Sequence, residues 1–340
     1  MNSVFTTISE KHPRPLQLST WQTLLLRTLQ PLNPSSRLSR KLLRTAYGKK
    51  LKHMCQAGAA FQLTPTSTPQ AWNIHWKGRK LGTTSPFPNK KFTGKTLWIL
   101  ATGPSTNSQD LSQLQGMDVM GVNGAPAVCQ KHGVTPKFFV STDPDFFEHR
   151  MHLVALAVES GAHCFFSSNG ISKICQHAPH LFSKGTITLL ETVNRFYGIK
   201  QLTPQQLFQQ AAADHDMVLP DASQHKVGWS HNLLKGVFAS NTVTYSACQL
   251  ACWLGYKTVN ILGMDLGASP DGPVRAYEQG DQARPSKLEE SYNVSILPAF
   301  ELMASLNLPT ICQTLSPHSR LPETVIPKKS YETALDDIRA

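Results

Sequence analysis

Acidic residues are nearly absent from the first 95 residues of this 340-residue chain. That stretch contains 16 Lys and Arg and a single acid, Glu10, whereas the other 245 residues carry 17 basic and 21 acidic side chains. The net charge of +11 therefore arises in the N-terminal part. Such asymmetry indicates a polyanionic partner, either anionic lipid, nucleic acid or a phosphorylated glycan. We expect no nucleic acid, because no recognised nucleic-acid-binding module accompanies the charge.

Long apolar runs and paired cysteines are lacking as well. The longest apolar runs, such as residues 258–264, are far shorter than the ~18 residues of a membrane-spanning helix. Residues 1–10 are polar and carry a carboxylate, unlike a secretory signal. The seven cysteines include no C-x-x-C pair, which favours reduced thiols in the cytosol. With 40% apolar residues, the chain is expected to fold around a packed core.

Leucines recur at helical spacing through the basic N-terminal region. They are Leu24, Leu25, Leu26, Leu29, Leu38, Leu42, Leu43 and Leu51, with Lys and Arg between them. Pro31 and Pro34 divide this region into two predicted helices. Such a helix can lie on an anionic membrane, or it can pack on the body with a solvated basic face. Residues 63–95, rich in Pro, Thr, Ser and Lys, are interpreted as a linker anchored by Trp72 and Trp76. A basic region, 1–95, is thus expected to precede a body, 96–340.

From residue 96 onward, short apolar runs alternate with helical segments. The runs are 96–101, 117–122, 137–141, 163–167, 186–190, 258–264 and 309–314, and the helical stretches include 204–213, 242–254 and 288–306. Strands of four to seven residues that alternate with helices predict a parallel sheet covered on both faces.

Small polar residues stand at the ends of several of these runs and at the start of one helix. They are Gly103, Pro104, Ser105, Asn123, Asp143, Ser240, Asn241, Thr242 and Asp265. Ligands of open parallel sheets bind beyond the carboxyl ends of the strands, so together these residues predict a nucleotide pocket. Each alone is also typical of a turn or a helix cap. The turn at 102–105 is expected to open a helix, but it is neither G-x-G-x-x-G nor a Walker loop, which disfavours a dinucleotide or a Mg-ATP site.

Three segments carry a family resemblance. They are the Ile-Leu-Ala-Thr-Gly-Pro-Ser stretch at 99–105 with Val122-Asn123, the Asp-Pro-Asp-Phe-Phe-Glu stretch at 143–148, and residues 247–265 with Leu-Gly-Tyr-Lys and Gly-Met-Asp. In order and spacing they resemble the bacterial sialyltransferases of glycosyltransferase family 42. They also resemble the related lipopolysaccharide-core transferases of Kdo, 3-deoxy-manno-octulosonate. The likeness covers residues 96–322.

The resemblance implies a Rossmann-like variant of the GT-A fold with a lid at about 267–292. It also implies a CMP-activated acidic sugar as donor, with no essential metal and no cofactor. By resemblance, Gly103, Ser105 and Asn123 contact the nucleotide, Asp143 stands where the family has Asn, and Asn241 and Thr242 begin the helix that faces the phosphate. Tyr277 matches one of two lid tyrosines that bond the departing phosphate; the other falls near Gly267 and is missing. Arg275, with Arg284 and Lys287, could replace its contribution electrostatically.

The general base departs from the family pattern. The family uses a lid histidine, but residues 268–300 contain none. Glu289 and Glu290 are the nearest substitutes, with Tyr292 and His231 as further candidates. A carboxylate that acts as a base near neutral pH needs a raised pKa, which burial in a closed lid could provide. The alternative is that both glutamates form the exposed acidic start of a helix.

The expected enzyme is a glycosyltransferase that moves an acidic 2-keto sugar from CMP to a lipopolysaccharide-core or similar lipid-linked glycan by an inverting single displacement. Residues 284–288 and 315–322 look more like the Kdo transferases, so Kdo is favoured over sialic acid. The expected location is the cytoplasm, peripherally on the inner face of a bacterial inner membrane, through the basic region.

Three alternatives stay open. Asp143-Pro144-Asp145 reads as D-x-D, the motif with which many transferases hold Mg²⁺ or Mn²⁺ beneath a UDP- or GDP-sugar. The second alternative is that proteins with a similar Gly-Pro-Ser turn and a Leu-Gly … Asp segment resemble pterin diphosphokinases, which transfer pyrophosphate from ATP. The third alternative is a non-catalytic adaptor whose basic arm binds an anionic surface.

Overall fold

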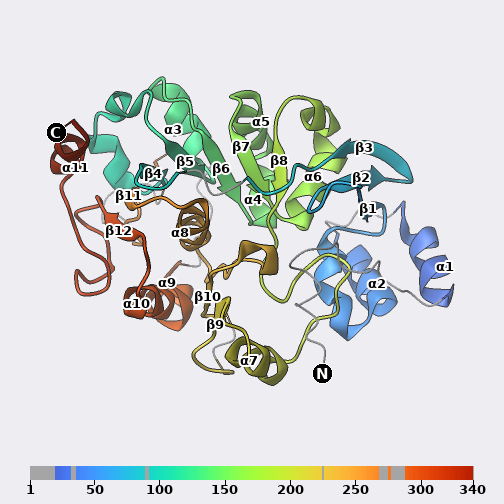
Figure 1. Ribbon diagram of the computed structural model, residues 1–340. Helices are drawn as coiled ribbons and strands as arrows, with labels where there is room; N and C mark the ends of the chain where they lie inside the picture. Colours follow the sequence, from blue (N-terminus) through green and yellow to red (C-terminus); the bar gives the residue numbers. More distant parts are fainter. Residues whose placement is uncertain are drawn as a thin grey trace.

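A seven-stranded parallel sheet forms the centre of the computed structural model, which describes residues 20–31, 36–88, 92–223, 226–267, 275–276 and 288–339 (Figure 1). Its strands are β4 (Thr96–Leu100), β5 (Val119–Val122), β6 (Phe138–Ser141), β7 (His163–Phe166), β8 (Ile187–Leu189), β11 (Thr258–Leu262) and β12 (Ile311–Thr314). They lie in the order β12-β11-β4-β5-β6-β7-β8, and each neighbouring pair is parallel. Each of the seven predicted runs forms one strand, and the predicted Rossmann-like α/β fold is confirmed.

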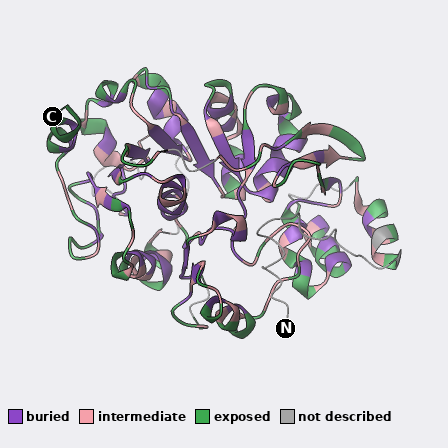
Figure 2. Ribbon diagram, viewed as in Figure 1, coloured by how far each residue is buried: buried purple, intermediate pink, exposed green. Residues whose placement is uncertain are grey.

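Apolar side chains leave β4 toward both faces of the sheet. Leu97 and Ile99 join one core cluster, and Trp98 and Leu100 join another. In a strand that is buried on both faces, side chains on either side contact the core and are apolar. This explains why these strands were recognisable as continuous apolar runs. In Figure 2 most of the sheet is purple, the colour of buried residues.

Helices cover both faces. On one face, α8 (Val243–Leu254) and α10 (Leu297–Ser305) pack in the cluster that contains Leu97 and Ile99. The other face is covered by α3 (Ala125–Lys131), α5 (Met151–Glu159), α6 (Ser168–His177) and α11 (Tyr331–Arg339). The remaining helices of the body are α4 (Pro144–His149), α7 (Pro204–Ala212) and α9 (Leu288–Ser291). A π-helical turn, Tyr292–Ile296, joins α9 to α10, so the helix predicted over 288–306 is present with this irregularity.

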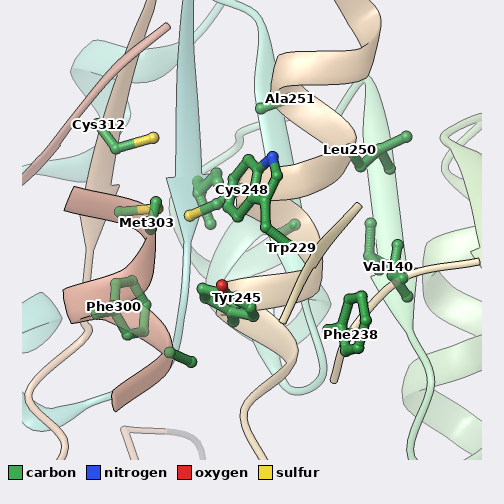
Figure 3. Packing of buried hydrophobic residues seen from close by; sticks show 14 of the residues in the cluster. Val140, Trp229, Phe238, Tyr245, Cys248, Leu250, Ala251, Phe300, Met303 and Cys312 are labelled. Atoms are coloured by element: carbon green, nitrogen blue, oxygen red, sulfur yellow. The ribbon is translucent and has the colours of Figure 1, made fainter. Parts of the chain in front are cut away.

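The segment before α8 is held against that helix by aromatic rings and one amide. Tyr245 contacts the rings of Trp229 and Phe300 edge to face, at centroid distances of 5.6 and 5.3 Å (Figure 3). The buried Gln249 side chain accepts hydrogen bonds from the N–H groups of Ser230 and Phe238, at 3.2 and 3.1 Å. Trp229 and Ser230 form β10 (Trp229–Ser230), which pairs with β9 (Met217–Val218). These contacts position the residues that lead into α8.

Two helices form the basic N-terminal region, as predicted. α1 (Thr20–Leu29) and α2 (Arg37–Tyr47) end and begin on either side of the predicted proline break, and a 3-10 segment, Lys49–Gln56, follows. Ser36 caps α2 by accepting a hydrogen bond from the N–H of Ser39 at 3.0 Å. Among the described residues, no helix is long and apolar enough to span a membrane.

The stretch interpreted as a linker is instead an antiparallel sheet of β1 (Phe61–Pro65), β2 (Trp72–Trp76) and β3 (Arg79–Thr83). Phe61, Leu63 and Ile74 are buried in one cluster with residues of α4, α5 and α6. Trp72 and Trp76 pack against the same cluster, so they anchor the segment to the body. The linker interpretation was wrong because it rested on the many Thr, Ser and Lys residues. The segment also has a short alternation of apolar and polar positions, which is typical of half-buried strands.

Candidate active site

The sheet has a topological switch point between β4 and β11. From β4 the chain proceeds through β5, β6, β7 and β8 on one side, and it returns to β11 and β12 on the other side of β4. Ligands of open parallel sheets bind beyond the carboxyl ends of the strands at such a point. The turns that follow β4 and β11 are therefore the centre of the candidate site.

Gly103 lies where these two turns approach each other. Its N–H donates to the carbonyl oxygen of Gly263 at 2.8 Å. A Cβ atom at position 103 would lie 2.5 Å from Asp265 Oδ2 and 2.6 Å from the Gly263 oxygen, so only glycine fits. Pro104 then opens a 3-10 helix of five residues, Pro104–Ser108. The helix predicted after this turn is present only in this short form. Its first amides are not free for a phosphate, because the Ser105 N–H donates to Asp265 and the Thr106 N–H donates to the Gly103 carbonyl oxygen.

Ser105 and Asp265 are brought together, and they bond to each other. Asp265 accepts hydrogen bonds from the Ser105 N–H at 2.8 Å and from the Ser105 hydroxyl at 2.5 Å. Ser316, in the loop after β12, lies 3.2 Å from the Ser105 hydroxyl and accepts a hydrogen bond from the N–H of Met264 at 2.8 Å. Both Asp265 and Ser316 are buried. Asp265 thus fixes the shape of the turn after β4, because it accepts hydrogen bonds from both the N–H and the hydroxyl of Ser105.

Ser316 and Arg320 were not predicted as site residues. Both lie in segment 315–322, which the sequence marked only by its resemblance to Kdo transferases. The N–H of Arg320 donates to the carbonyl oxygen of Asp265 at 3.0 Å. The signal that could have found Ser316 is its place directly beyond the last strand, where the other polar residues of the site also lie.

Asn123 and Asp143 lie at the ends of β5 and β6. Asn123 has a φ of +46°, and its side-chain oxygen accepts a hydrogen bond from the hydroxyl of Ser141 at 2.9 Å. Asp143 caps α4 by accepting a hydrogen bond from the N–H of Asp145 at 3.0 Å. The turn and cap roles are therefore present. Among the described residues, the Asn123 amide nitrogen has no partner, so it is available to a ligand.

Asp143 and Arg275 lie near each other. Solvent reaches the Asp143 side chain, but the many protein atoms around it raise its pKa by desolvation, and the charge of Asp145 adds to this. The Arg275 charge acts in the opposite direction. The N–H of the next residue, Ala276, donates to the Thr102 oxygen at 2.8 Å, which places Arg275 beside the turn after β4. Tyr277 and most of the predicted lid lie outside the described residues.

The start of α8 belongs to the same edge. The helix ends at the amino edge, where the Leu254 carbonyl accepts a hydrogen bond from the N–H of Phe92, so it begins at the carboxyl edge. Ser240 and Asn241 precede it with φ values of +43° and +58°. Thr242, the residue at the cap position, makes no side-chain bond to the first turn. Amides of a first helical turn that lack a cap attract an anion such as phosphate.

Glu289 and Glu290 are exposed at the beginning of α9. Glu289 is 74% exposed and forms an ion pair with Arg320 at 2.5 Å. The Arg320 guanidinium lies over the ring of Tyr292, whose hydroxyl donates to the Arg320 oxygen at 2.7 Å. The described residues do not bury either glutamate, so they do not supply the burial on which a raised carboxylate pKa would depend. The structure matches the alternative reading, an exposed acidic helix start.

Comparison with known proteins shows the family of the chain. Residues 87–330 match the model of a family described as 3-deoxy-D-manno-octulosonic acid transferase WaaZ. The chain belongs to the WaaZ family of Kdo transferases. All the predicted site residues lie within the matched range, and α1 and α2 lie before it. The expected glycosyltransferase and the resemblance to Kdo transferases are confirmed.

Individual relatives of this WaaZ-family chain are distant. The "Probable 3-deoxy-manno-octulosonic acid transferase" of Escherichia coli (strain K12) is 22% identical over 208 residues, which cover 60% of this chain and 72% of that protein. The sialyltransferase CstII from Campylobacter jejuni, solved in complex with a substrate analogue, cytidine-5'-monophosphate, aligns with 16% identity and a TM-score of 0.35. That alignment covers 69% of this chain and 85% of CstII. The Maf glycosyltransferase from Magnetospirillum magneticum AMB-1 aligns with 10% identity and a TM-score of 0.43 over 94% of this chain and 48% of that one.

Asp143 and Asp145 do not form a metal centre with a third ligand in the described part of this WaaZ-family chain, where no three His, Cys, Asp or Glu side chains gather in a ligand-like group. Asp143 faces the N–H of Asp145, and this bond is the one expected of a helix cap. A hollow of about 620 Å³ lies elsewhere, between the β1–β2 turn and residues 80–86. None of the predicted site residues lines it.

Proposed function

We propose that the protein transfers Kdo from CMP-Kdo to a lipopolysaccharide-core or similar lipid-linked glycan at the cytoplasmic face of a bacterial inner membrane. The match of residues 87–330 to the WaaZ family carries this proposal. The polar groups that converge around the switch point support it, because a nucleotide-activated sugar needs several hydrogen-bonding groups at one edge of the sheet.

The donor phosphate would lie at the start of α8. The first-turn amides there have no side-chain cap, and the phosphate of a CMP-linked sugar carries one negative charge, which helix amides can stabilise. Asn123 would donate its amide to the nucleotide, and Asp143 would accept from its hydroxyl or amino groups. Asp265 would act through Ser105 by holding the turn after β4 in a shape that admits the donor.

The reaction would be a single displacement with inversion, and it would need no metal. The bond between the anomeric carbon and the phosphate oxygen breaks while an acceptor hydroxyl bonds to that carbon. Arg275 would neutralise the charge that develops on CMP, and Tyr277 would donate a hydrogen bond to it. We assign the acceptor proton to Glu290 in preference to Glu289, because Arg320 already holds Glu289. The described residues leave Glu290 exposed, so this role would require the predicted lid to bury it and raise its pKa. Arg320 also connects the start of α9 to Asp265, because its guanidinium pairs with Glu289 and its N–H donates to the Asp265 carbonyl oxygen.

The test is CMP release from CMP-Kdo and, separately, from CMP-sialic acid, with a truncated core lipid as acceptor. We expect release with CMP-Kdo and retained activity in excess EDTA. Silence with both donors would refute the proposal. A strict Mn²⁺ requirement with a UDP- or GDP-sugar would favour the D-x-D alternative instead, which Asp143 and Asp145 would then serve.

Glu290→Gln tests the assignment of the base, with Glu289→Gln as its matched control. The loss of a general base lowers kcat by about 100-fold or more. We expect this loss for Glu290→Gln alone, because the control removes an equal charge from the same helical turn. Equal kcat values of the two variants would show that Glu290 is not the general base.

A further inference from the structure

The outward sides of α1 and α2 carry large apolar side chains that the fold leaves uncovered. Trp21, Leu24, Leu38 and Leu42 are 56%, 57%, 69% and 42% exposed. The other large apolar residues of comparable exposure in the described ranges, Val294, Ile311 and Ile338, lie far along the chain from these four. These four exposed apolar side chains lie on two helices that contact each other, and exposed apolar residues gathered in one part of a fold indicate an interaction site.

The two helices do not need these side chains to stay folded. Their inward sides bury Leu26, Leu43 and Tyr47 in a cluster with the 3-10 segment that follows α2. That segment is bonded to the body, since the Lys50 carbonyl accepts a hydrogen bond from the N–H of Gln201 at 2.8 Å. A hydrogen bond of 2.8 Å also joins the His53 ring to the Phe196 carbonyl. The exposed residues therefore lie on a fixed support, and the exposed green parts of both helices are visible in Figure 2.

Cations alternate with the apolar residues on the outward side of α2. Positions 37, 38, 41, 42 and 45 share one side of a helix, and they hold Arg, Leu, Lys, Leu and Thr, all exposed. Residues 20–60 contain eight Lys and Arg, and the sequence has no Asp or Glu between Glu10 and Asp110. Among the described residues, none of these eight cations forms an ion pair with a carboxylate. The described part of the chain thus supplies no carboxylate partner for this surface.

We infer that this surface, Trp21, Leu24, Arg37, Leu38, Lys41 and Leu42, docks the protein on an anionic phospholipid bilayer. Leucines and a tryptophan suit the boundary between headgroups and acyl chains, and lysine and arginine suit the lipid phosphates. Each such cation strengthens binding to an anionic bilayer by about fivefold. Nucleic acid is a poorer match, because apolar side chains on the outward face would gain nothing from a phosphate backbone. The inference deepens the proposed function by naming where the enzyme meets the membrane of its lipid-linked acceptor.

The experiment is co-sedimentation of the full-length protein with phosphatidylcholine vesicles, with and without phosphatidylglycerol. We expect binding to the anionic vesicles, and at least tenfold weaker binding to pure phosphatidylcholine or at high salt. The double variant Leu38→Gln/Leu42→Gln is expected to bind at least tenfold more weakly, because two leucines no longer enter the bilayer. Arg37→Gln/Lys41→Gln is expected to lose at least tenfold as well.

Matched controls separate this surface from general effects. Val294→Gln/Ile311→Gln removes exposed apolar side chains elsewhere, and Lys131→Gln/Lys184→Gln removes two exposed cations elsewhere. Both controls are expected to bind vesicles like the unaltered protein. Thermal unfolding checks every variant, and because the altered side chains are exposed we expect unchanged melting temperatures.

Unaltered vesicle binding by Leu38→Gln/Leu42→Gln would overturn the inference, and so would equal binding to vesicles with and without phosphatidylglycerol. Tighter binding to double-stranded RNA than to anionic vesicles would overturn it in favour of nucleic acid. Vesicle binding needs neither donor nor acceptor, so its result is independent of the proposed transfer reaction. The leucine variant is expected to release CMP from CMP-Kdo normally with a delipidated, water-soluble acceptor.

Discussion

The two edges of the central sheet turn the chain with different residues. At the amino edge, the residues with positive φ before five of the strands are all glycines: Gly94, Gly116, Gly133, Gly161 and Gly255. At the carboxyl edge, positive φ falls on Asn123, Ser240, Asn241 and Leu266 in addition to Gly263. Glycine adopts this conformation freely, whereas other residues pay about 1 kcal/mol or more. Backbone strain is therefore concentrated at the edge that holds the candidate site.

Polar side chains differ between the edges in the same sense. At the amino edge, Asp118 accepts hydrogen bonds from Lys137 at 2.6 Å and from the Tyr256 hydroxyl at 2.8 Å. The Tyr256 ring stacks on the Phe92 ring, and the Lys137 ammonium group also lies over the Phe92 ring. The polar groups of Asp118, Lys137 and Tyr256 are therefore paired with one another. At the carboxyl edge, the Asn123 amide and the first turn of α8 keep unused donors in the described structure. The comparison supports the proposal that the carboxyl edge meets the donor, since the polar groups of the amino edge are already paired with one another.

The largest expected effect is that of Asp265→Ala on catalysis. Without the carboxylate, the Ser105 amide and hydroxyl lose their partner and the turn after β4 moves. A displacement of about 1 Å at a reacting site costs about 100-fold, so kcat/KM for CMP-Kdo should fall by that factor. CMP release under steady-state conditions measures it.

Asp118→Ala is the matched control at the amino edge. It removes an equally charged side chain, and it leaves Lys137 and Tyr256 without their acceptor. We expect normal kcat/KM and a free energy of unfolding lowered by about 2 kcal/mol. If Asp118→Ala impaired catalysis as much as Asp265→Ala, the distinction between the edges would fail.

The next effect concerns pH and the carboxyl group of Glu191, two residues beyond β8. It is buried and accepts hydrogen bonds from the N–H groups of Ser168 and Tyr197, at 3.2 and 2.9 Å. Burial raises its pKa from 4.5 to about 7, so the folded protein holds the proton more tightly than the unfolded chain. The contribution of this group is therefore fully present below about pH 4.5 and is lost as the pH rises through about 7.

Urea unfolding at pH 5 and pH 8 measures the Glu191 effect. We expect this group to lower the free energy of unfolding by about 2 kcal/mol between the two values. Glu191→Gln cannot ionise, and its unfolding free energy should lack this part of the pH dependence. If the unfolding free energy of Glu191→Gln changed between pH 5 and pH 8 as much as that of the unaltered protein, the Glu191 carboxyl group would not be desolvated at this edge.

The smallest expected effects come from one substitution at a positive-φ residue of each edge, Gly161→Ala at the amino edge and Asn241→Gly at the carboxyl edge. Gly161 has a φ of +84° with open space around it, so Gly161→Ala should lower the free energy of unfolding by about 1 kcal/mol through strain alone. Its activity should not change. Asn241→Gly relieves strain but loses the hydrogen bond to Ser295, so its stability should stay nearly constant. Its kcat/KM should fall about fivefold, the equivalent of one hydrogen bond of about 1 kcal/mol. Denaturant midpoints and CMP release decide whether this opposite pattern holds.

The central sheet could be predicted because its strands are buried on both faces. A segment such as β4 then consists of consecutive apolar residues, and its length separates it from a helix. The β1–β3 sheet could not be predicted in the same way. It is only half buried, so its apolar positions alternate with Thr, Lys and Asn and resemble a linker in composition.

The positions of several candidate-site residues at strand ends could be predicted from the sequence, but their hydrogen bonds to one another could not. Gly103, Ser105 and Asp265 were chosen because they end strands, and that reasoning requires only the local pattern. Their mutual contacts depend on β11 lying next to β4, and strand order is a long-range property across 160 residues. For the same reason Ser316 was missed, since its bond to Met264 exists only once β12 lies beside β11.

Hydrogen–deuterium exchange with and without CMP tests the central claim most directly, because it reports which edge of the sheet meets the nucleotide. The account predicts slower exchange, on adding CMP, in peptides that cover residues 102–108, 123–127 and 240–246. It predicts no change in peptides around Asp118, Lys137 and Tyr256. Protection at the amino edge, in the hollow beside β1–β3, or nowhere would contradict the assignment of the carboxyl edge as the donor site.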